Sequence, residues 1–377
     1  MRGTKARREV FGHVGKGVRN MKKQMRDSNI ELLRIVAMLG VIVLHFNGGY
    51  GNALELVKEG TINFYILEFL ESLFIPAVNI FILVSGYFLC DSYKRPITKA
   101  LYLIIQVMIF RVGIYVAGCV IGKSGFSVGS VLCALLPINY YVILYVVLYL
   151  ISPYLNLCLI KMSAKQRTGM VLVSVFLFSV WPTLVDIIEE VIGQELSGLN
   201  TIGLEGDQSG YTIVNFILLY LIGAYLKMAD IQWGKFKSIL IILGCAVALS
   251  LWQLALPESA WMYCNPLVIL EAVAFFLLFK QFKWKSIVVN VLAKGVFTCF
   301  LLHGEFFRFL PIEKFINASA WKLGLFLVGV AIGIYIVCVG VHYLYAIFEN
   351  YVVKNLLKFL NKVVLDVEPN EEGKLCK

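Results

Sequence analysis

The first strongly apolar stretch of the sequence, NIELLRIVAMLGVIVLHFN at positions 29–47, contains three ionisable residues. Arg34 and His45 are eleven residues apart, so on a helix they share one face and lie about 16 Å apart along its axis. Glu31 falls close to the same face. Histidine can act as a general base near neutral pH, and arginine can bind phosphate or carboxylate groups. We therefore expect this face to look onto a protein interior or a wet cavity, with His45, Glu31 and Arg34 as candidate catalytic residues.

A second histidine of interest, His303, lies in the apolar stretch TCFLLHGEFFRF. It is about fifteen residues from the inner end of its segment, as His45 is, so the two imidazoles are expected at similar depth. Glu305 and Arg308 follow it, three residues apart, a spacing that allows a local ion pair. A lone membrane histidine is often only a hydrogen-bonding group between helices, but two at matching depth favour catalysis. Glu305 and Arg308 are predicted to shape the substrate site.

Glu68, Asn79 and Gly86 form another stripe, with spacings of eleven and seven residues, and Glu71 lies beside it. The plainer alternative is a helix face that is buried against its neighbours by hydrogen bonds. We predict that Glu68 and Asn79 contact the substrate. The Ser85–Gly86 pair is interpreted as a close-packing point between helices.

Arg111 and Glu271 are lone charges within other apolar segments. Each is half of an ion pair between helices, or Arg111 extends to a membrane interface. The sequence does not pair them, and both alternatives stay open.

The composition requires a membrane around these charges. Hydrophobic residues make up 59% of the 377 residues and charged residues 15%, against roughly 25% charged in soluble domains. Ten apolar segments recur, most of them about 20 residues long, which is enough to cross roughly 30 Å of hydrocarbon. They lie at about 30–46, 62–89, 100–121, 138–160, a fifth that ends near Val185, then 210–226, 238–256, 261–279, 288–310 and 320–346.

The distribution of charge predicts the orientation. Residues 1–28 hold nine Lys or Arg and two acids; the four predicted inner loops hold twelve Lys or Arg and the five outer loops three. This is the positive-inside pattern, and it explains the net charge of +10 without a nucleic-acid partner. We expect an all-α integral membrane protein, a bundle of about ten transmembrane helices with both termini cytoplasmic. Residues 1–28 would be a basic tail, 29–347 the membrane domain and 348–377 a cytoplasmic C-terminal tail.

Several familiar chemistries are absent from the sequence. The nine cysteines are scattered and form no CxxC pair, so neither a disulfide framework nor a metal site is predicted. There is no GxSxG, HExxH, Walker or dinucleotide motif.

Five segments, in this order, resemble acyltransferase family 3, a family of multi-span membrane proteins. They are NIELLRIVAMLGVIVLHF, with Arg34 and His45; AVNIFILVSGYFL at 77–89, followed by Lys94 and Arg95; YYVILYVVLYLISPYLN at 140–156, with Tyr141 and Val142 where Trp and Phe are usual; FILLYLIGAYL at 216–226; and VFTCFLLHGEFFR at 296–308, with Phe300 at the usual Tyr. The resemblance covers nearly all of residues 27–346.

The resemblance implies transfer of an acyl group, most often acetyl from acetyl-CoA, to a hydroxyl of a cell-surface glycan or a lipid-linked precursor. It implies that His45 is essential and that Arg34, Lys94 and Arg95 lie on the donor side. Tyr141 is assigned to the substrate site. Acyl-CoA is then a co-substrate and no bound cofactor is expected. The localisation implied is a cell membrane, that of a bacterium, and the oligomeric state stays open.

Two other classes of function compete with this hypothesis. A transporter or flippase for a glycan or a small molecule would also have polar residues on inward faces, although no inverted repeat or paired broken span is evident. A membrane anchor for other enzymes would leave the intramembrane charges unexplained. Binding or hydrolysis of acetyl-CoA distinguishes the acyltransferase from both.

Overall fold

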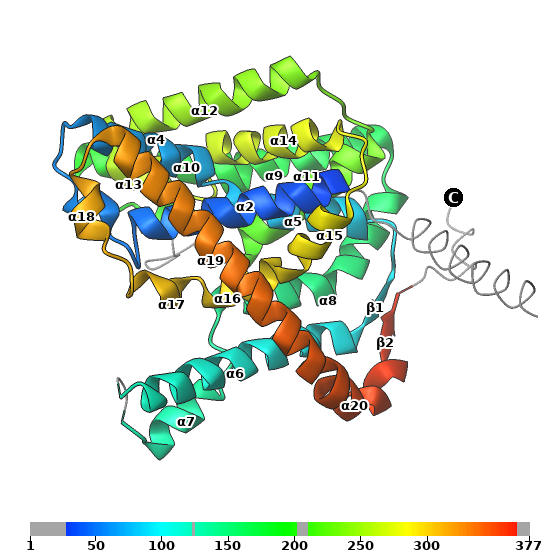
Figure 1. Ribbon diagram of the computed structural model, residues 1–377. Coiled ribbons are helices and arrows are strands. Elements are labelled where there is room, and N and C mark those ends of the chain that lie inside the picture. Colours follow the sequence, from blue (N-terminus) through cyan, green and yellow to red (C-terminus); the bar gives the residue numbers. More distant parts are fainter. Residues whose placement is uncertain (1–27, 123–124, 202–209, 368–377) are drawn as a thin grey trace, which may run out of the picture.

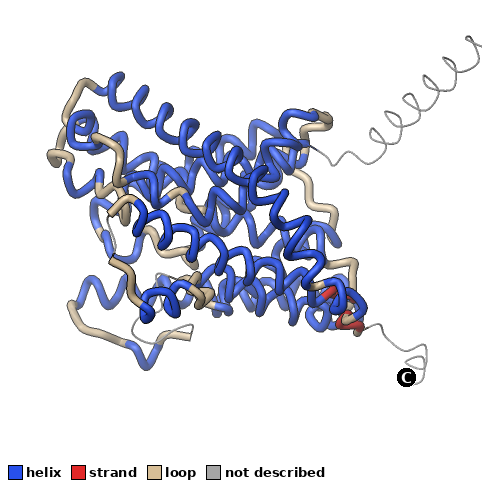
Figure 2. The backbone as a smooth tube through the Cα atoms, turned by 60° about the horizontal axis from the view of Figure 1, so that its bottom comes forward, coloured by secondary structure: helices blue, strands red, loops and turns tan. Residues whose placement is uncertain are grey.

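The computed structural model describes residues 28–122, 125–201 and 210–367, and these form a bundle of helices with one small pair of strands (Figure 1). The long helices lie side by side in Figure 2, and the strands lie at one end of the bundle. In chain order the elements are α2 (Ser28–Asn47), α3 (Ala53–Leu56), α4 (Ile62–Phe74), α5 (Ala77–Leu89), β1 (Lys94–Pro96), α6 (Ile97–Val120), α7 (Val128–Ala134), α8 (Tyr140–Lys161), α9 (Ala164–Val175), η1 (Phe176–Val180), α10 (Trp181–Ile192), η2 (Ser197–Leu199), α11 (Ile213–Met228), α12 (Lys235–Ala255), α13 (Pro257–Ala260), α14 (Pro266–Lys280), α15 (Ile287–Leu292), η3 (Ala293–Gly295), α16 (Val296–Leu302), α17 (Gly304–Phe307), α18 (Ile312–Ile316), α19 (Ala320–Phe348), η4 (Glu349–Val353), α20 (Lys354–Leu356), η5 (Lys358–Lys362) and β2 (Val364–Asp366).

Within the described residues, seven helical segments are long and apolar enough to cross a membrane. They are 28–47, 62–89, 97–120, 140–161, 164–192, 235–255 and 320–356. The other three predicted segments form shorter apolar helices, namely α11, α14 and the run 287–302. The chain is therefore a mostly helical, multi-pass membrane protein, whereas the number of ten crossings and the cytoplasmic termini stay predictions.

The segment at 62–89 is divided at Pro76 into α4 and α5. Proline has no N–H to donate, so the ladder of helical hydrogen bonds is interrupted there. The stripe predicted through Glu68, Asn79 and Gly86 assumed one continuous helix, and the break places Glu68 and Asn79 on different helices.

Helices α5 and α11 pack closely because each has a glycine at the contact. A Cβ on Gly86 would overlap the main-chain oxygen of Tyr220, and one on Gly223 would overlap that of Leu83. The sequence-based interpretation of Gly86 as a close-packing point is confirmed. This contact fixes the position of α5, whose last turns line the site described below.

The junction after α5 depends on a proline in α8. Pro153 cannot donate to the Tyr149 carbonyl oxygen, and the Ser152 hydroxyl donates to it instead, at 2.8 Å. The same hydroxyl oxygen accepts a hydrogen bond from Arg95 Nε at 2.8 Å. Arg95 Nη2 donates to the carbonyl oxygen of Leu89, the last residue of α5, at 3.0 Å. The segments 77–89 and 140–156 are thereby joined through one guanidinium group.

The C-terminal part of the described chain returns to this junction. Strand β2 pairs antiparallel with β1, and Lys94 Nζ lies 3.1 Å from Asp366 Oδ2. The sequence pattern predicts helices alone, and this strand pair corrects that prediction. The predicted basic tail lies outside the described residues except for Ser28, and so does the end of the predicted C-terminal tail, 368–377.

Candidate active site

Helix α2 is the element around which the site is built. It contacts α4, α5, α14, α15, α16 and α19, and most of its residues are buried. Near its beginning, Arg34 Nη1 lies 3.0 Å from Glu31 Oε2, so the two side chains form an ion pair one turn apart. Arg34 has five N–H donors, and this bond leaves others for a ligand.

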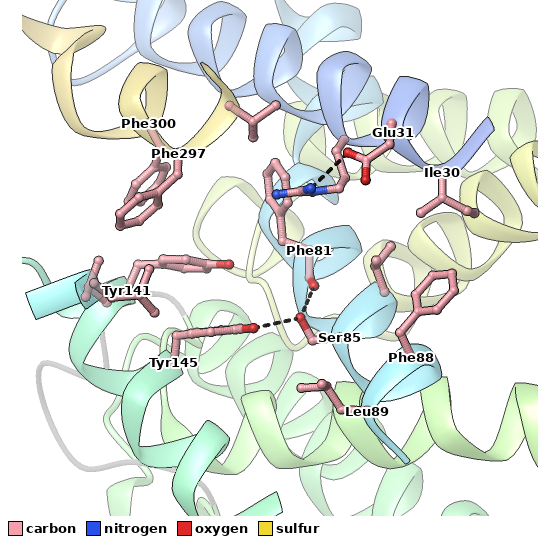
Figure 3. A pocket seen from close by; sticks show the side chains of 15 residues that line it. Ile30, Glu31, Phe81, Ser85, Phe88, Leu89, Tyr141, Tyr145, Phe297 and Phe300 are labelled. Atoms are coloured by element: carbon pink, nitrogen blue, oxygen red, sulfur yellow. Dashed lines mark hydrogen bonds and ion pairs between the residues drawn. The ribbon is translucent and has the colours of Figure 1, made fainter. Parts of the chain in front are cut away.

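A cavity of about 660 Å³ lies beside this ion pair (Figure 3). The first half of α2, the last turns of α5, the start of α8, Leu103 of α6 and α16 form its walls. Its volume lies within the range of about 300–1,000 Å³ that is usual for small-molecule sites. The lining is mostly apolar, and its polar side chains among the described residues are Glu31, Arg34, Ser85, Tyr141 and Tyr145.

Two tyrosines of α8 extend across the cavity in Figure 3. Tyr145 approaches Ser85, with 3.4 Å between the two hydroxyl oxygens, and Ser85 donates to the Phe81 carbonyl oxygen. The Tyr141 ring lies 4.8 Å from the ring of Phe300. The cavity thus offers aromatic rings to the apolar part of a ligand and the Arg34 guanidinium to an anionic part.

The structure brings the two predicted histidines together. The ring centres of His45 and His303 are 4.8 Å apart, and Phe300 is 6.3 Å from His303. His303 Nδ1 donates to the Cys299 carbonyl oxygen at 3.0 Å, since a carbonyl can only accept. That bond leaves His303 Nε2 as an acceptor, and this atom has no hydrogen-bond partner among the described residues. Phe300 thus lines the cavity and also lies next to His303 of the imidazole pair.

Tyr50 covers the two imidazoles. Its ring centre is 5.1 Å from that of His45 and 6.2 Å from that of His303. Gly49 has a φ of +65°, which a residue with a side chain rarely adopts, and it turns the chain back over the end of α2. A Cβ on Gly304 would lie 2.5 Å from Tyr50 Cζ, so only glycine leaves room for the ring there. Sequence reasoning missed Tyr50, although the glycines that flank it in NGGYGN mark a tight turn.

Of the three residues predicted on the donor side, Lys94 and Arg95 differ from each other in exposure. Arg95 is 1% exposed, and it donates to Ser152, Leu89 and Lys94 oxygens. A guanidinium enclosed in this way cannot reach a ligand, so the structure does not support Arg95 as a phosphate-binding residue. Lys94 is half-exposed and pairs with Asp366 at the same end of the bundle.

Neither Asn79 nor Glu68 lines the cavity. Asn79 Nδ2 donates to the main-chain oxygen of Tyr263 at 2.8 Å, so Asn79 positions that segment. Glu68 is buried, and its Oε2 has no partner among the described residues. Its neighbour Glu71 accepts a hydrogen bond from Asn47, two residues beyond His45.

Glu305 and Arg308 form the local ion pair that their spacing predicts, and neither residue lines the cavity. Of the two lone charges, Arg111 donates to the carbonyl oxygens of Cys133 and Ile138. Glu271 is fully buried, and neither of its carboxylate oxygens has a partner within the described ranges. Arg111 and Glu271 are therefore not halves of one ion pair.

The structure thus combines a multi-pass bundle of helices with a buried helix that carries an arginine beside a cavity and a histidine near its other end. Residues 27–345 match the family model described as an acyltransferase domain, which is most of the chain. The protein belongs to acyltransferase family 3 and is a membrane acyltransferase. Comparison with curated proteins and with solved structures gave no significant match.

Proposed function

We propose that the protein transfers an acetyl group from cytoplasmic acetyl-CoA to a hydroxyl of an extracytoplasmic polysaccharide or its precursor, in the plasma membrane of a bacterium. The observation that carries this proposal is the cavity lined by both Arg34 and Phe300, since the Phe300 ring lies 6.3 Å from that of His303 in the His45–His303 pair. Arg34 and His45 are about 16 Å apart along α2, which is of the order of the length of an extended thioester arm.

In this proposal the donor enters from the end of the bundle that carries Arg34 and Lys94. Arg34, held by Glu31, binds an anionic part of coenzyme A, and Lys94 adds positive charge at the same end. Tyr141 and Phe300 contact the arm, and the thioester carbon reaches the imidazoles. We assign Arg95 the structural task of joining α5 to α8.

The chemistry needs a base, because a neutral hydroxyl is a poor nucleophile. His45 takes the hydroxyl proton as the oxygen attacks the thioester carbonyl carbon, and the carbon–sulfur bond then breaks. The sulfur leaves as a thiolate, which takes the proton from the His45 imidazolium and departs as free coenzyme A. His303 Nε2 accepts a hydrogen bond from the acceptor and orients it. Tyr50 positions both rings.

The test measures release of free thiol from acetyl-CoA by the purified protein in lipid nanodiscs. His45→Ala is expected to lower turnover by about 10²–10⁴-fold, the usual contribution of a general base. His342→Ala is the matched control, because His342 bonds to Thr298 and does not contact His45 or the cavity. Unchanged turnover in His45→Ala would refute the assignment.

A variant of the mechanism has His45 carry the acetyl group itself. It requires that label from [¹⁴C]acetyl-CoA be trapped on the protein when acceptor is withheld. Absence of protein-bound label, with transfer intact, would leave direct attack by the hydroxyl as the mechanism. A flippase would show neither label nor thiol release.

A further inference from the structure

Tyr50 is the first of four tyrosines that extend away from the imidazole pair. We name the set Tyr50, Tyr140, Tyr211 and Tyr263 the tyrosine strip. Tyr140 directly precedes Tyr141, whose ring centre is 4.8 Å from that of Phe300, and the Phe300 ring centre is 6.3 Å from that of His303. The ring centres of Tyr140 and Tyr211 are 4.5 Å apart and those of Tyr211 and Tyr263 are 3.8 Å apart. Three rings of the strip are therefore in contact as far as the start of α14, and the fourth, Tyr50, lies against His45.

The members of the tyrosine strip come from four separate segments of the chain. Tyr50 follows α2, Tyr140 begins α8, Tyr211 precedes α11, and Tyr263 lies between α13 and α14. Local chain geometry cannot align residues this far apart in sequence, so tertiary packing holds them together.

Specific contacts hold the far end of the strip in place. The Tyr263 main-chain oxygen accepts hydrogen bonds from Asn79 at 2.8 Å and from Asn215 at 3.5 Å. Gly210, directly before Tyr211, has a φ of +89°, and a Cβ there would lie 2.9 Å from the Cys264 nitrogen. The strip is thus a positioned surface, as a binding site requires.

The tyrosine strip is also accessible. Tyr50 is 57% exposed and Tyr140 is 40% exposed, and the other two tyrosines are partly exposed. The hydroxyls of Tyr140 and Tyr263 lie within hydrogen-bonding reach of the Tyr211 hydroxyl, so the strip offers both ring faces and polar groups.

This combination of aromatic ring faces and hydroxyl groups favours sugars as ligands. Pyranose sugars have flat C–H faces, which pack on aromatic rings, and hydroxyls, which bond to phenols. The interactions found for the four tyrosines within the described residues involve rings, asparagines and Glu71, and no Lys or Arg. The lack of a Lys or Arg partner for these tyrosines among the described residues favours a neutral ligand over one with a carboxylate or phosphate.

We infer that the tyrosine strip binds the acceptor as a neutral pyranose ring, laid on the phenols so that one hydroxyl lies at the His45–His303 pair. This inference rests on the proposed function and specifies its acceptor. It assigns Asn79 the role of a positioning residue, which holds Tyr263.

The experiment measures acetyl transfer from acetyl-CoA by the full-length protein in nanodiscs to neutral methyl pyranosides, a methyl glucuronide and glycerol. The wild type is expected to prefer at least one neutral pyranoside over both other acceptors. Tyr140→Ala and Tyr211→Ala are each expected to raise KM for that pyranoside by about two- to tenfold, the worth of one aromatic contact. The ratio of kcat/KM for the pyranoside to that for glycerol falls accordingly.

Two variants separate binding from folding. Tyr140→Phe keeps the ring and is expected to keep most of the preference for the pyranoside. Tyr65→Ala removes a tyrosine of similar exposure on α4, which contacts Phe64 and no member of the strip, and should leave the preference unaltered.

The inference is overturned if the wild type uses glycerol or the glucuronide as well as every neutral pyranoside, or if the preference survives both alanine substitutions. Either result leaves the proposed function standing. If the wild type cleaves no acetyl-CoA with any acceptor, the proposed function itself fails.

Discussion

Replacing Gly304 by alanine adds one methyl group beside the ring of Tyr50. The new Cβ would lie 2.5 Å from Tyr50 Cζ, whereas carbon atoms pack at about 3.5–4.0 Å. The ring must therefore move by about 1 Å. Tyr50 is exposed, so it can move without disturbing the core, and the fold should survive.

We expect the substitution to lower the rate of acetyl transfer and to leave the melting temperature of the protein almost unchanged. A displacement of about 1 Å at a reacting centre can lower the rate about 100-fold, which corresponds to about 2.7 kcal/mol of activation free energy. The assay is thiol release in the presence of acceptor, alongside a thermal melt of the same preparation. Gly324→Ala is the control, because a Cβ there meets nothing within 4 Å.

A double substitution tests the physical reasoning. If the added methyl acts by displacing Tyr50, then Gly304→Ala should cost nothing further in a Tyr50→Ala background. The same loss in both backgrounds would refute the argument, since the methyl would then act on some other group.

Two further substitutions test the packing that positions the site. Gly86→Ala is expected to destabilise the protein by about 3 kcal/mol or more, because the added Cβ would overlap the main chain of Tyr220, which cannot rotate away. The yield of monodisperse protein and its melting temperature measure this loss. An unchanged melting temperature would contradict the prediction. Ser152→Ala is expected to cost about 1–3 kcal/mol, because it leaves an Arg95 donor and the Tyr149 carbonyl oxygen unsatisfied; an unchanged melting temperature would show that other groups satisfy them.

Most of the helices could be predicted from the sequence, because a chain in lipid must satisfy its backbone groups internally and an apolar run of about 20 residues does so as a helix. Ion pairs between residues one helical turn apart were also predictable. The three-residue spacings in Glu31–Arg34 and Glu305–Arg308 set the distances between their side chains before any packing occurs.

The hydrogen-bond partners of Arg95 and Asn79 could not be predicted from the sequence. Both are polar residues near apolar helices, and both were predicted to bind ligands. Arg95 finds its partner Ser152 57 residues further along the chain, and Asn79 finds Tyr263 184 residues away. A polar side chain takes the partner that packing supplies, and sequence spacing carries no information about partners on other elements.

The short pairing of β1 with β2 was missed because three residues form too brief a pattern to recognise. Pro76 is evident in the sequence, but the sequence does not show that it divides the helix. A proline within an apolar run can end a helix or only kink it, and contacts with neighbouring helices decide which.

The sequence by itself determined that Arg34 and His45 share one face of α2, because helical periodicity sets distances within a helix. It also placed a second histidine at similar depth in another segment. Only the tertiary structure decided that the His45 and His303 rings meet, 4.8 Å apart, with Tyr50 over both. Contacts between residues on different segments depend on how the helices pack, which helical periodicity does not determine. Here Gly304, which has no side chain, leaves the space that the Tyr50 ring fills.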